Sequence, residues 1–140
     1  MMIMDMRTAI IVRKDLPVGQ IANVSAIVMA EVARAVPSVL AAQPVNDLND
    51  CRHAAPRFSV VVLRANGSEQ LGHFAVAMTM ERPQLFVVGF SEVGQGFHNA
   101  FDLYRARIME LSTEATRLVA VAISGDEVAI RRATKRFSVL

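Results

Sequence analysis

Short apolar runs rich in β-branched residues alternate along this sequence with longer segments whose apolar residues repeat at helical spacing. Such runs predict strands covered on both faces, and their alternation with helices predicts a mostly parallel sheet joined by right-handed crossovers. The sequence therefore predicts an α/β fold with a mixed, mostly parallel sheet of four or five strands. The predicted strands are TAIIV (8–12), FSVVVLR (58–64), QLFVVGF (84–90) and RLVAVAIS (117–124), with RFSVL (136–140) as a candidate edge strand.

Three longer segments carry the helical pattern. Residues 18–36 are apolar around most of the helix circumference, and Pro37 ends them because it cannot continue a helical ladder. Residues 69–81 follow Ser68, which can cap a helix, although HFAVAMTM within them would also alternate as a strand. In residues 97–111 the apolar side chains recur on one side, which predicts an amphipathic helix that must pack on something.

The connections between these elements are short, with one exception. Residues 37–57, with three prolines and the turn-prone NDLND, are longer than compact domains usually tolerate without internal structure. Part of this segment is predicted to be a short hairpin or an extended edge. Near the end of the sequence, Gly125 and Asp126 are expected to open a short helix that ends in Arg131 and Arg132.

The composition fits one globular domain, residues 1–140, and argues against a nucleic-acid binder. Hydrophobic residues make up 53% of the sequence and charged residues 20%, which excludes disorder and leaves little polar surface. Together with the nearly all-apolar helix at 18–36, this predicts a homodimer whose interface covers apolar side chains. The net charge is only +2, whereas a nucleic-acid partner would favour a stronger basic bias.

The single cysteine and the apolar runs bear on the cellular compartment. Cys51 cannot form an internal disulfide, so a reducing compartment, the cytoplasm, is predicted. The opening MMIMDM is short, is followed closely by Arg7 and lacks a positive n-region, so no signal peptide is expected. The apolar runs fall short of the ~20 residues that cross a bilayer, and no membrane partner is predicted.

Chemistry is expected where loops meet at the carboxyl ends of strands, because ligands of open α/β sheets bind there. Three stretches qualify: RKDLPVGQ (13–20), FSEVGQG (90–96) and SGDE (124–127). We expect these loops to converge on one rim and to bring distant side chains into one pocket. The candidate pocket residues are Arg13, Asp15, Gly19, Gln20, Asn23, Ser91, Glu92 and Gln95.

The polar cluster after the first strand has two interpretations. In the functional one, Asp15 caps a helix or forms a salt bridge, Pro17 pre-sets the turn and Gly19 permits close backbone approach. Gln20 and Asn23 are then the first outward polar groups of the following helix. In the other interpretation these residues are ordinary turn chemistry without a ligand, and the sequence leaves both open.

A family resemblance appears at the same turn. IIVRKDLPVGQIANVSAIV resembles the opening of a family of small bacterial proteins that is catalogued as a domain of unknown function and grouped with the type II peptidyl-tRNA hydrolases. The similarity continues in VVGFSEVGQ, in AFDLY and in the closing VAVAISGDEVAIRRATKRFSVL, and it is weakest over residues 37–57. The resemblance implies a three-layer α/β/α domain with a mixed sheet, often a homodimer, and no established activity.

The catalytic pattern of the hydrolase relatives is largely missing here. In that pattern a strand ends in Arg, and Asp-Leu, Gly-Lys, Ala-Gln and a nearby His follow; the matching residues here are Arg13, Asp15, Leu16 and Gly19. Gln20 stands in place of the lysine, Asn23 or Val24 in place of the glutamine, and Ile27 near the histidine. The relatives' Asp-Ala-Gly-x-Thr turn is replaced by FSEVGQG. Gln20 offers a neutral dipole where the lysine would supply a fixed positive charge.

Two functions remain open from the sequence. The first is a binding domain without hydrolase activity that takes a small ligand or a protein partner at the predicted rim. The second is a divergent esterase acting on peptidyl-tRNA or a related acylated substrate, with Asp15 and Asn23 orienting water and Arg13 or Gln20 steadying the developing charge. We favour the first because no nucleophile or general base is recognisable. Catalytic residues are therefore unknown, and no cofactor or metal is predicted.

Other candidate groups have simpler explanations. Cys51 and His53, with the nearby Asp47 and Asp50, could supply half of a metal site, yet no second Cys/His pair at ligand spacing is present. Cys51 is therefore expected to be free and inert. A basic cluster near the end of the sequence is expected to be a solvated face. Its alternative role is contact with RNA phosphates, which would weaken steeply with added salt. The cluster consists of Arg131, Arg132, Lys135 and Arg136.

Overall fold

A computed structural model of the protein describes residues 5–140. Residues 1–4, the greater part of the opening segment for which no signal peptide is expected, lie outside the described residues. The elements in chain order are β1 (Met6–Arg13), α1 (Val18–Ala35), a 3₁₀ turn η1 (Pro37–Val39), β2 (Val45–Asn46), β3 (Arg52–His53), β4 (Ser59–Ala65), α2 (Ser68–Glu81), β5 (Phe86–Ser91), α3 (Glu92–Gln95), α4 (Phe101–Met109), α5 (Thr113–Thr116), β6 (Leu118–Asp126), α6 (Glu127–Ala133) and β7 (Ser138–Val139).

The main sheet is mixed and has five strands in the order β5-β6-β1-β4-β7. β1 and β4 are parallel neighbours, whereas β6 runs antiparallel to β1 and β5, and β7 runs antiparallel to β4. The prediction of a mostly parallel sheet is therefore wrong. The physical reason is that α3, α4 and α5 return the chain to the edge where β5 ended, so that Leu118 pairs with Ser91 and β6 runs back beside β5.

Strand direction decides which loops share an edge. β1, β4 and β5 point the same way and end at one edge of the sheet, which we call the carboxyl edge. β6 ends at the opposite edge, where Asp126 pairs with Met6 at the start of β1. The predicted third loop, 124–127, therefore does not join the rim. The turn after β4, residues 66–67, lies at the carboxyl edge instead.

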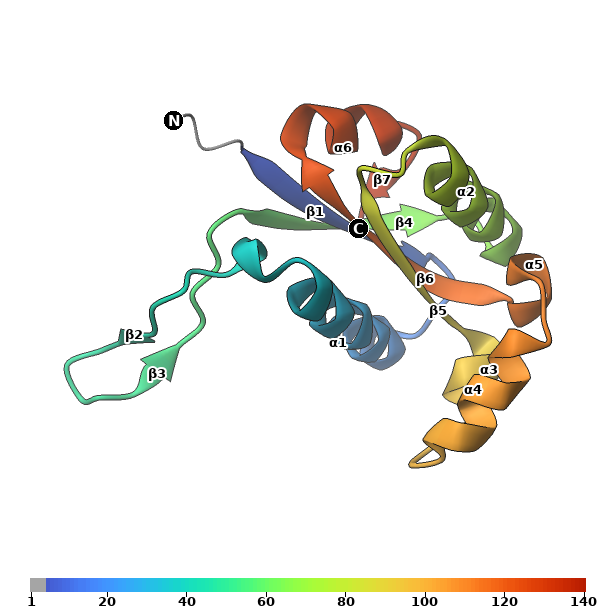
Figure 1. Ribbon diagram of the computed structural model, residues 1–140, viewed down its shortest axis with the longest axis horizontal. Coiled ribbons are helices and arrows are strands. Elements are labelled where there is room, and N and C mark those ends of the chain that lie inside the picture. The colour runs from blue at the N-terminus through green and yellow to red at the C-terminus, as the bar shows by residue number, and fades with distance from the viewer. Residues whose placement is uncertain (1–4) are drawn as a thin grey trace.

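Helices cover both faces of this sheet (Figure 1). α1 packs on one face through Val24, Val28 and Val32, which are buried against alternate strand residues such as Ile10 and Val12. α2 and α6 pack on the other face, where the core includes the following buried side chains: Ala9, Ile11, Leu71, Phe74, Val121, Ile123 and Ile130. Alternate side chains of β1 thus point into the two cores, as expected for a strand that is covered on both faces.

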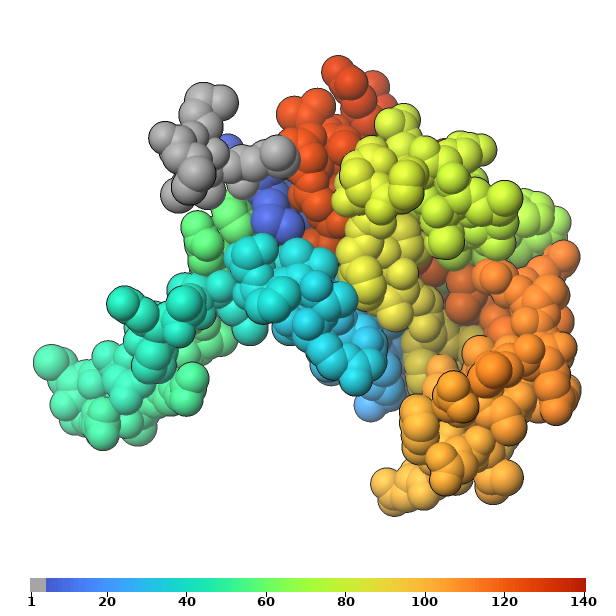
Figure 2. Space-filling model, in the orientation of Figure 1, coloured from blue at the N-terminus to red at the C-terminus, as the bar shows by residue number. Residues whose placement is uncertain are grey.

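The predicted hairpin within residues 37–57 is confirmed, but it stands outside the main sheet. β2 and β3 pair with each other, Val45 with His53. We call residues 41–55 the arm. It leaves the body beside the end of α1, and Figures 1 and 2 show it standing clear of the rest of the molecule. At its tip Leu48 is 105% exposed, so no described part of the chain covers it.

The predicted helices are confirmed, with corrections at their ends and faces. α2 forms rather than the alternative strand, but it begins at Ser68 with Gly67 as its cap residue, so Ser68 does not act as the cap. The amphipathic segment 97–111 forms a shorter helix than predicted, α4 (Phe101–Met109), none of whose residues is fully buried, and Phe101 is 68% exposed. Its apolar face is therefore only partly covered. Across residues 5–140, no helix has both the length and the apolarity of a bilayer span.

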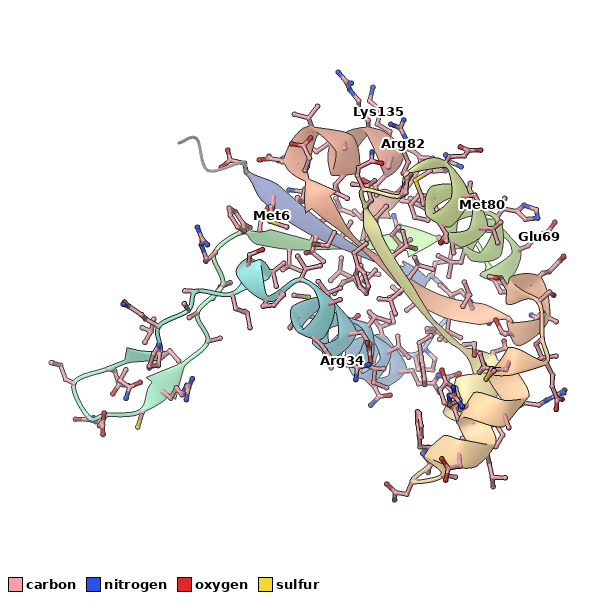
Figure 3. All side chains as sticks on the ribbon, in the orientation of Figure 1. Met6, Arg34, Glu69, Met80, Arg82 and Lys135 are labelled. Carbon is pink, nitrogen blue, oxygen red and sulfur yellow. The ribbon has the colours of Figure 1, made fainter. Side chains whose placement is uncertain are left out.

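The core predicts the effect of removing the ring of Phe74, which is 1% exposed and packs edge-on against Phe137 at 5.1 Å between centroids. We expect Phe74→Ala to lower the free energy of unfolding by about 3–5 kcal/mol, because it leaves a cavity between α2 and the sheet. Met80, in the same helix, is 77% exposed and points outward in Figure 3. Met80→Ala should change stability by less than about 0.5 kcal/mol. Urea denaturation measures both; equal costs would contradict this core.

Candidate functional site

Arg13, the last residue of β1, is the centre of an ion-pair network at the carboxyl edge. Its Nε and Nη2 donate to Oδ1 and Oδ2 of Asp15 at 3.0 and 2.9 Å, and its Nη1 donates to Oε1 of Glu92. The Arg13 side chain is only 13% exposed. Because Asp15 is bound in the bidentate geometry that matches a guanidinium to a carboxylate, the Arg13 side chain is held in one orientation.

Glu92 carries the network on to a second arginine. Oε2 of Glu92 accepts a hydrogen bond from Nε of Arg117 at 3.0 Å, and the Glu92 backbone N–H donates to the Arg117 carbonyl at 2.9 Å. Arg117 immediately precedes β6 and has a φ of 58°, in the left-handed region that non-glycine residues rarely adopt. The negative Glu92 thus lies between the positive Arg13 and Arg117, and the three residues join the ends of β1, β5 and β6 at this edge.

Local turn chemistry places these side chains. Pro17 precedes α1, and its carbonyl accepts from the Gln20 N–H at 2.9 Å, so the turn after β1 leads directly into the helix. Asp15 forms a salt bridge and does not cap α1. Ser91 is buried, and its Oγ accepts from the Gly94 N–H at 3.1 Å, which caps α3 and fixes the neighbouring Glu92.

The network makes both carboxylates stronger acids. The hydrogen bond from Arg13 is the main cause that lowers the pKa of Asp15 below its ordinary value of 3.8. The same guanidinium, with a further contribution from Arg117, lowers the pKa of Glu92 below 4.5. The two carboxylates in turn raise the pKa of Arg13. A general base works best with a pKa near the operating pH, so neither carboxylate is suited to that task at pH 7.

The structure brings together some of the predicted site residues and not others. Arg13 contacts both Asp15 and Glu92, as the prediction of a shared rim requires. Ser91 acts as a helix cap, and Gln95 lies half-buried in α3. Gly19, Gln20 and Asn23 are exposed on α1, and in the described part of the chain the ion-pair network does not include them. A Cβ at Gly19 would meet nothing within 4 Å, so no described part of the chain lies against its backbone.

Two apolar hollows flank α4, and the sequence indicated them only through the amphipathic pattern of that helix. One, of about 430 Å³, lies between α2, β5 and α4 and includes Ser91 and Tyr104 in its lining. The other, of about 590 Å³, lies between α1 and α4, and we call it the α1–α4 hollow. Its lining residues are Ile27, Phe90, Gly94, Phe97, Asn99, Ala100, Phe101 and Tyr104.

A third, polar hollow of about 370 Å³ lies at the ends of β1 and β4. This hollow was not among the predicted sites, because loop 124–127, and not the turn after β4, was expected at the carboxyl edge. The available signal was Asn66-Gly67, a common turn dipeptide, two residues after the predicted strand ends at Arg64. The lining residues are Lys14, Arg64, Asn66, Gln70, Arg136 and Ser138.

Asp47 holds the tip of the arm through hydrogen bonds to the His53 ring and to two backbone N–H groups. Nε2 of His53 lies 2.8 Å from Oδ2 of Asp47, while Oδ1 of Asp47 accepts from the backbone N–H groups of Asn49 and Cys51 at 2.9 and 3.1 Å. Asp47 is therefore used to close the hairpin tip. Within residues 5–140, no group of three or more His, Cys, Asp or Glu side chains is placed to hold a metal ion.

Comparison with known proteins gives a family and a fold. The family model described as "Protein of unknown function (DUF2000)" matches residues 6–140. No curated protein matches the sequence. Among solved structures, that of a protein of unknown function from Agrobacterium tumefaciens is similar with a TM-score of 0.78 at 19% identity, covering 99% of each chain. At this identity the similarity extends to the fold alone.

The network predicts a pH-dependent contribution of Arg13 to stability. Because the folded-state pKa values of Asp15 and Glu92 are lowered, this contribution is present above about pH 4.5 and is lost as the pH falls through the lowered values. We expect Arg13→Gln to lower the free energy of unfolding by about 2 kcal/mol at pH 7, with a smaller difference from the unmodified protein near pH 2.

Denaturant unfolding at several pH values measures this difference. Arg34→Gln is the control, because Arg34 is 77% exposed and pairs only with Glu31 one turn away on α1. Its removal should change stability little at any pH. A cost of Arg13→Gln that is the same at pH 7 and pH 2 would contradict the assignment of the network.

Proposed function

The chain belongs to the family of proteins of unknown function DUF2000, and from that premise we propose that it is a binding domain without peptidyl-tRNA hydrolase activity. We further propose that its fold is the three-layer α/β/α fold of the type II peptidyl-tRNA hydrolases. The packing of α1 on one face of the sheet and of α2 and α6 on the other supports this assignment. A bacterial, cytoplasmic location is part of the proposal, supported by the free and exposed Cys51.

The observation that carries the proposal is the pairing of Arg13 with two carboxylates. Its Nε, Nη1 and Nη2 all donate to carboxylate oxygens of Asp15 and Glu92. A guanidinium that stabilises an oxyanion must aim free N–H donors at the position where charge develops. Arg13 already neutralises two carboxylates, and Gln20, which replaces the relatives' lysine, carries no charge. The two groups at the positions of the relatives' arginine and lysine therefore do not offer an unpaired cation to an acyl-transfer transition state.

The carboxylates argue in the same direction. In the alternative function, a divergent esterase, Asp15 would orient or activate water. Asp15 is 58% exposed and its pKa is lowered by Arg13, so it is a weak base held by a strong partner. Asn23 is exposed on α1, outside the ion-pair network. The arrangement favours a structural use of these groups over a catalytic one.

Turnover of an acylated tRNA tests the proposal. We expect no hydrolysis above the uncatalysed rate at micromolar protein, because Arg13 is already paired with two carboxylates and the pKa of each carboxylate is lowered. Release of the acyl group is measured for the unmodified protein and for Asp15→Ala. Robust hydrolysis that disappears in Asp15→Ala would overturn the proposal and establish the esterase.

We also propose a homodimer in which the arm of each subunit covers the α1–α4 hollow of the other. Leu48 is fully exposed at the arm tip, and the hydrogen bonds of Asp47 hold that tip in shape. The hollow presents Phe97 and Phe101, aromatic rings that would enclose an aliphatic anchor. Figure 1 places the arm and α4 toward opposite ends of α1, so a two-fold axis near α1 would exchange both arms.

The size of the surface supports this arrangement. The 15-residue arm and the eight residues that line the hollow together reach the roughly 20–30 residues a side of a stable interface. An isolated two-stranded hairpin is marginally stable in water, and a partner surface would stabilise it. The exposed alanines on α1 would extend the contact.

Sedimentation tests the dimer. We expect a species of twice the 15.3 kDa chain mass at micromolar concentration, and we expect Leu48→Asp to shift it toward monomer, because a charge would then be buried in an apolar hollow. Val128→Asp is the control, since Val128 is also exposed but lies on α6. A monomeric unmodified protein would contradict the dimer, and an unchanged Leu48→Asp dimer would contradict the role of the arm.

A further inference from the structure

The polar hollow at the ends of the parallel strands β1 and β4 gathers three cationic side chains. Lys14 comes from the turn after β1, Arg64 from β4 itself, and Arg136 from the segment that leads into β7. No Asp or Glu is among its lining residues. Segments distant in the sequence therefore bring positive charge together without bringing a compensating carboxylate.

These cations are also without ion-pair partners elsewhere. In residues 5–140, no carboxylate lies within 4.0 Å of the charged groups of Lys14, Arg64 or Arg136. The salt bridges of this part of the chain are formed by Arg13, Arg34, Arg107, Arg117, Arg131 and His53. Arg13, which directly precedes Lys14, differs from these cations because it is paired with two carboxylates. Like charges held together repel one another, and an anion between them would remove that cost.

The sheet and two aromatic rings position the cluster. The Lys14 backbone N–H donates to the Ala65 carbonyl at 3.0 Å, and Arg64 is paired with Ser138 across β4 and β7. The guanidinium carbon of Arg136 lies 5.8 Å from the Phe74 ring centroid and 5.9 Å from that of Phe137. These contacts order the Arg136 side chain and leave its N–H groups without a carboxylate acceptor.

Neutral donors complete the lining. Oε1 of Gln70 accepts from the Asn66 backbone N–H at 2.8 Å, which leaves the Gln70 amide NH₂ free to donate. α2 starts beside these residues, has 14 residues and has no side-chain hydrogen bond at its cap residue Gly67. The N-terminal end of a helix favours negative charge, so the start of α2 adds to the field of the three cations.

From this arrangement we propose that the hollow binds the phosphate group of a small phosphorylated ligand. Arginine and lysine with amide donors are the groups that recognise phosphate oxygens, and the carboxyl ends of strands are where α/β sheets bind ligands. A volume of about 370 Å³ admits a small molecule, and the lining has no aromatic ring on which the bases of a single-stranded nucleic acid would stack. The inference adds a ligand class to the proposed binding function, at a site apart from the Arg13 network.

Titration with inorganic phosphate and with pyrophosphate, followed by backbone amide NMR at low ionic strength, tests the proposal. We expect saturable shifts confined to residues 14, 64–70 and 136–138. Lys14→Gln and Arg64→Gln should each weaken binding by about tenfold or more, because each removes a charge-assisted hydrogen bond. Arg105→Gln is the matched control: Arg105 is exposed on α4, away from the hollow, and its loss should leave the affinity unchanged.

Distinct results would overturn the inference. One is the absence of saturable shifts with either anion; another is an equal loss of affinity in Arg105→Gln, which would reduce the effect to overall charge. Saturable binding of a single-stranded oligonucleotide without binding of phosphate or pyrophosphate would also overturn it in favour of a nucleic-acid partner. The acyl-tRNA and sedimentation measurements are made without these anions. A negative result for phosphate binding therefore overturns this inference without deciding the proposed function, which those two measurements test.

Discussion

The hydrogen bonds of Arg13 to Asp15 and Glu92 are the interaction on which the arrangement of the carboxyl edge depends. They join the turn after β1 to the turn after β5, although β6 lies between those strands in the sheet. Arg117, just before β6, closes the chain of charges through Glu92. Three strand ends are thereby joined by side chains that neutralise one another.

Adjacent residues at this edge have opposite electrostatic roles. Arg13 is largely buried and paired, whereas its neighbour Lys14 faces a hollow that also contains Arg64 and Arg136 and no carboxylate. Charge within the network is therefore used for structure, and the charge beside it remains available for a ligand. The apolar face of α4 and the arm stand apart from both and fit contact with another protein surface.

Much of this architecture could be predicted from local patterns. Runs such as TAIIV fixed the position of β1, the apolar pattern before Pro37 predicted α1, and the proline-rich segment 37–57 indicated a hairpin. The contact of the Arg13 turn with Glu92 followed from the expectation that both strands end at one edge. The direction of β6 could not be predicted, because an apolar strand covered on both faces has the same pattern in either direction. Because β6 was expected to be parallel to its neighbours, loop 124–127 was expected at the carboxyl edge, and the hollow beside Arg64 was not predicted. The partial exposure of α4 could not be predicted either, because an amphipathic pattern does not indicate which surface covers the apolar face of a helix.

The central claim, that Arg13 ties the two turns together, is tested most directly by a double-mutant cycle between Arg13→Gln and Glu92→Gln, with the free energy of unfolding measured for the four proteins at pH 7. If the two side chains are joined as described, the double variant loses less stability than the sum of the single variants, with a coupling of about 1 kcal/mol or more. Additivity within about 0.3–0.5 kcal/mol would show that the two turns are independent and would contradict the account.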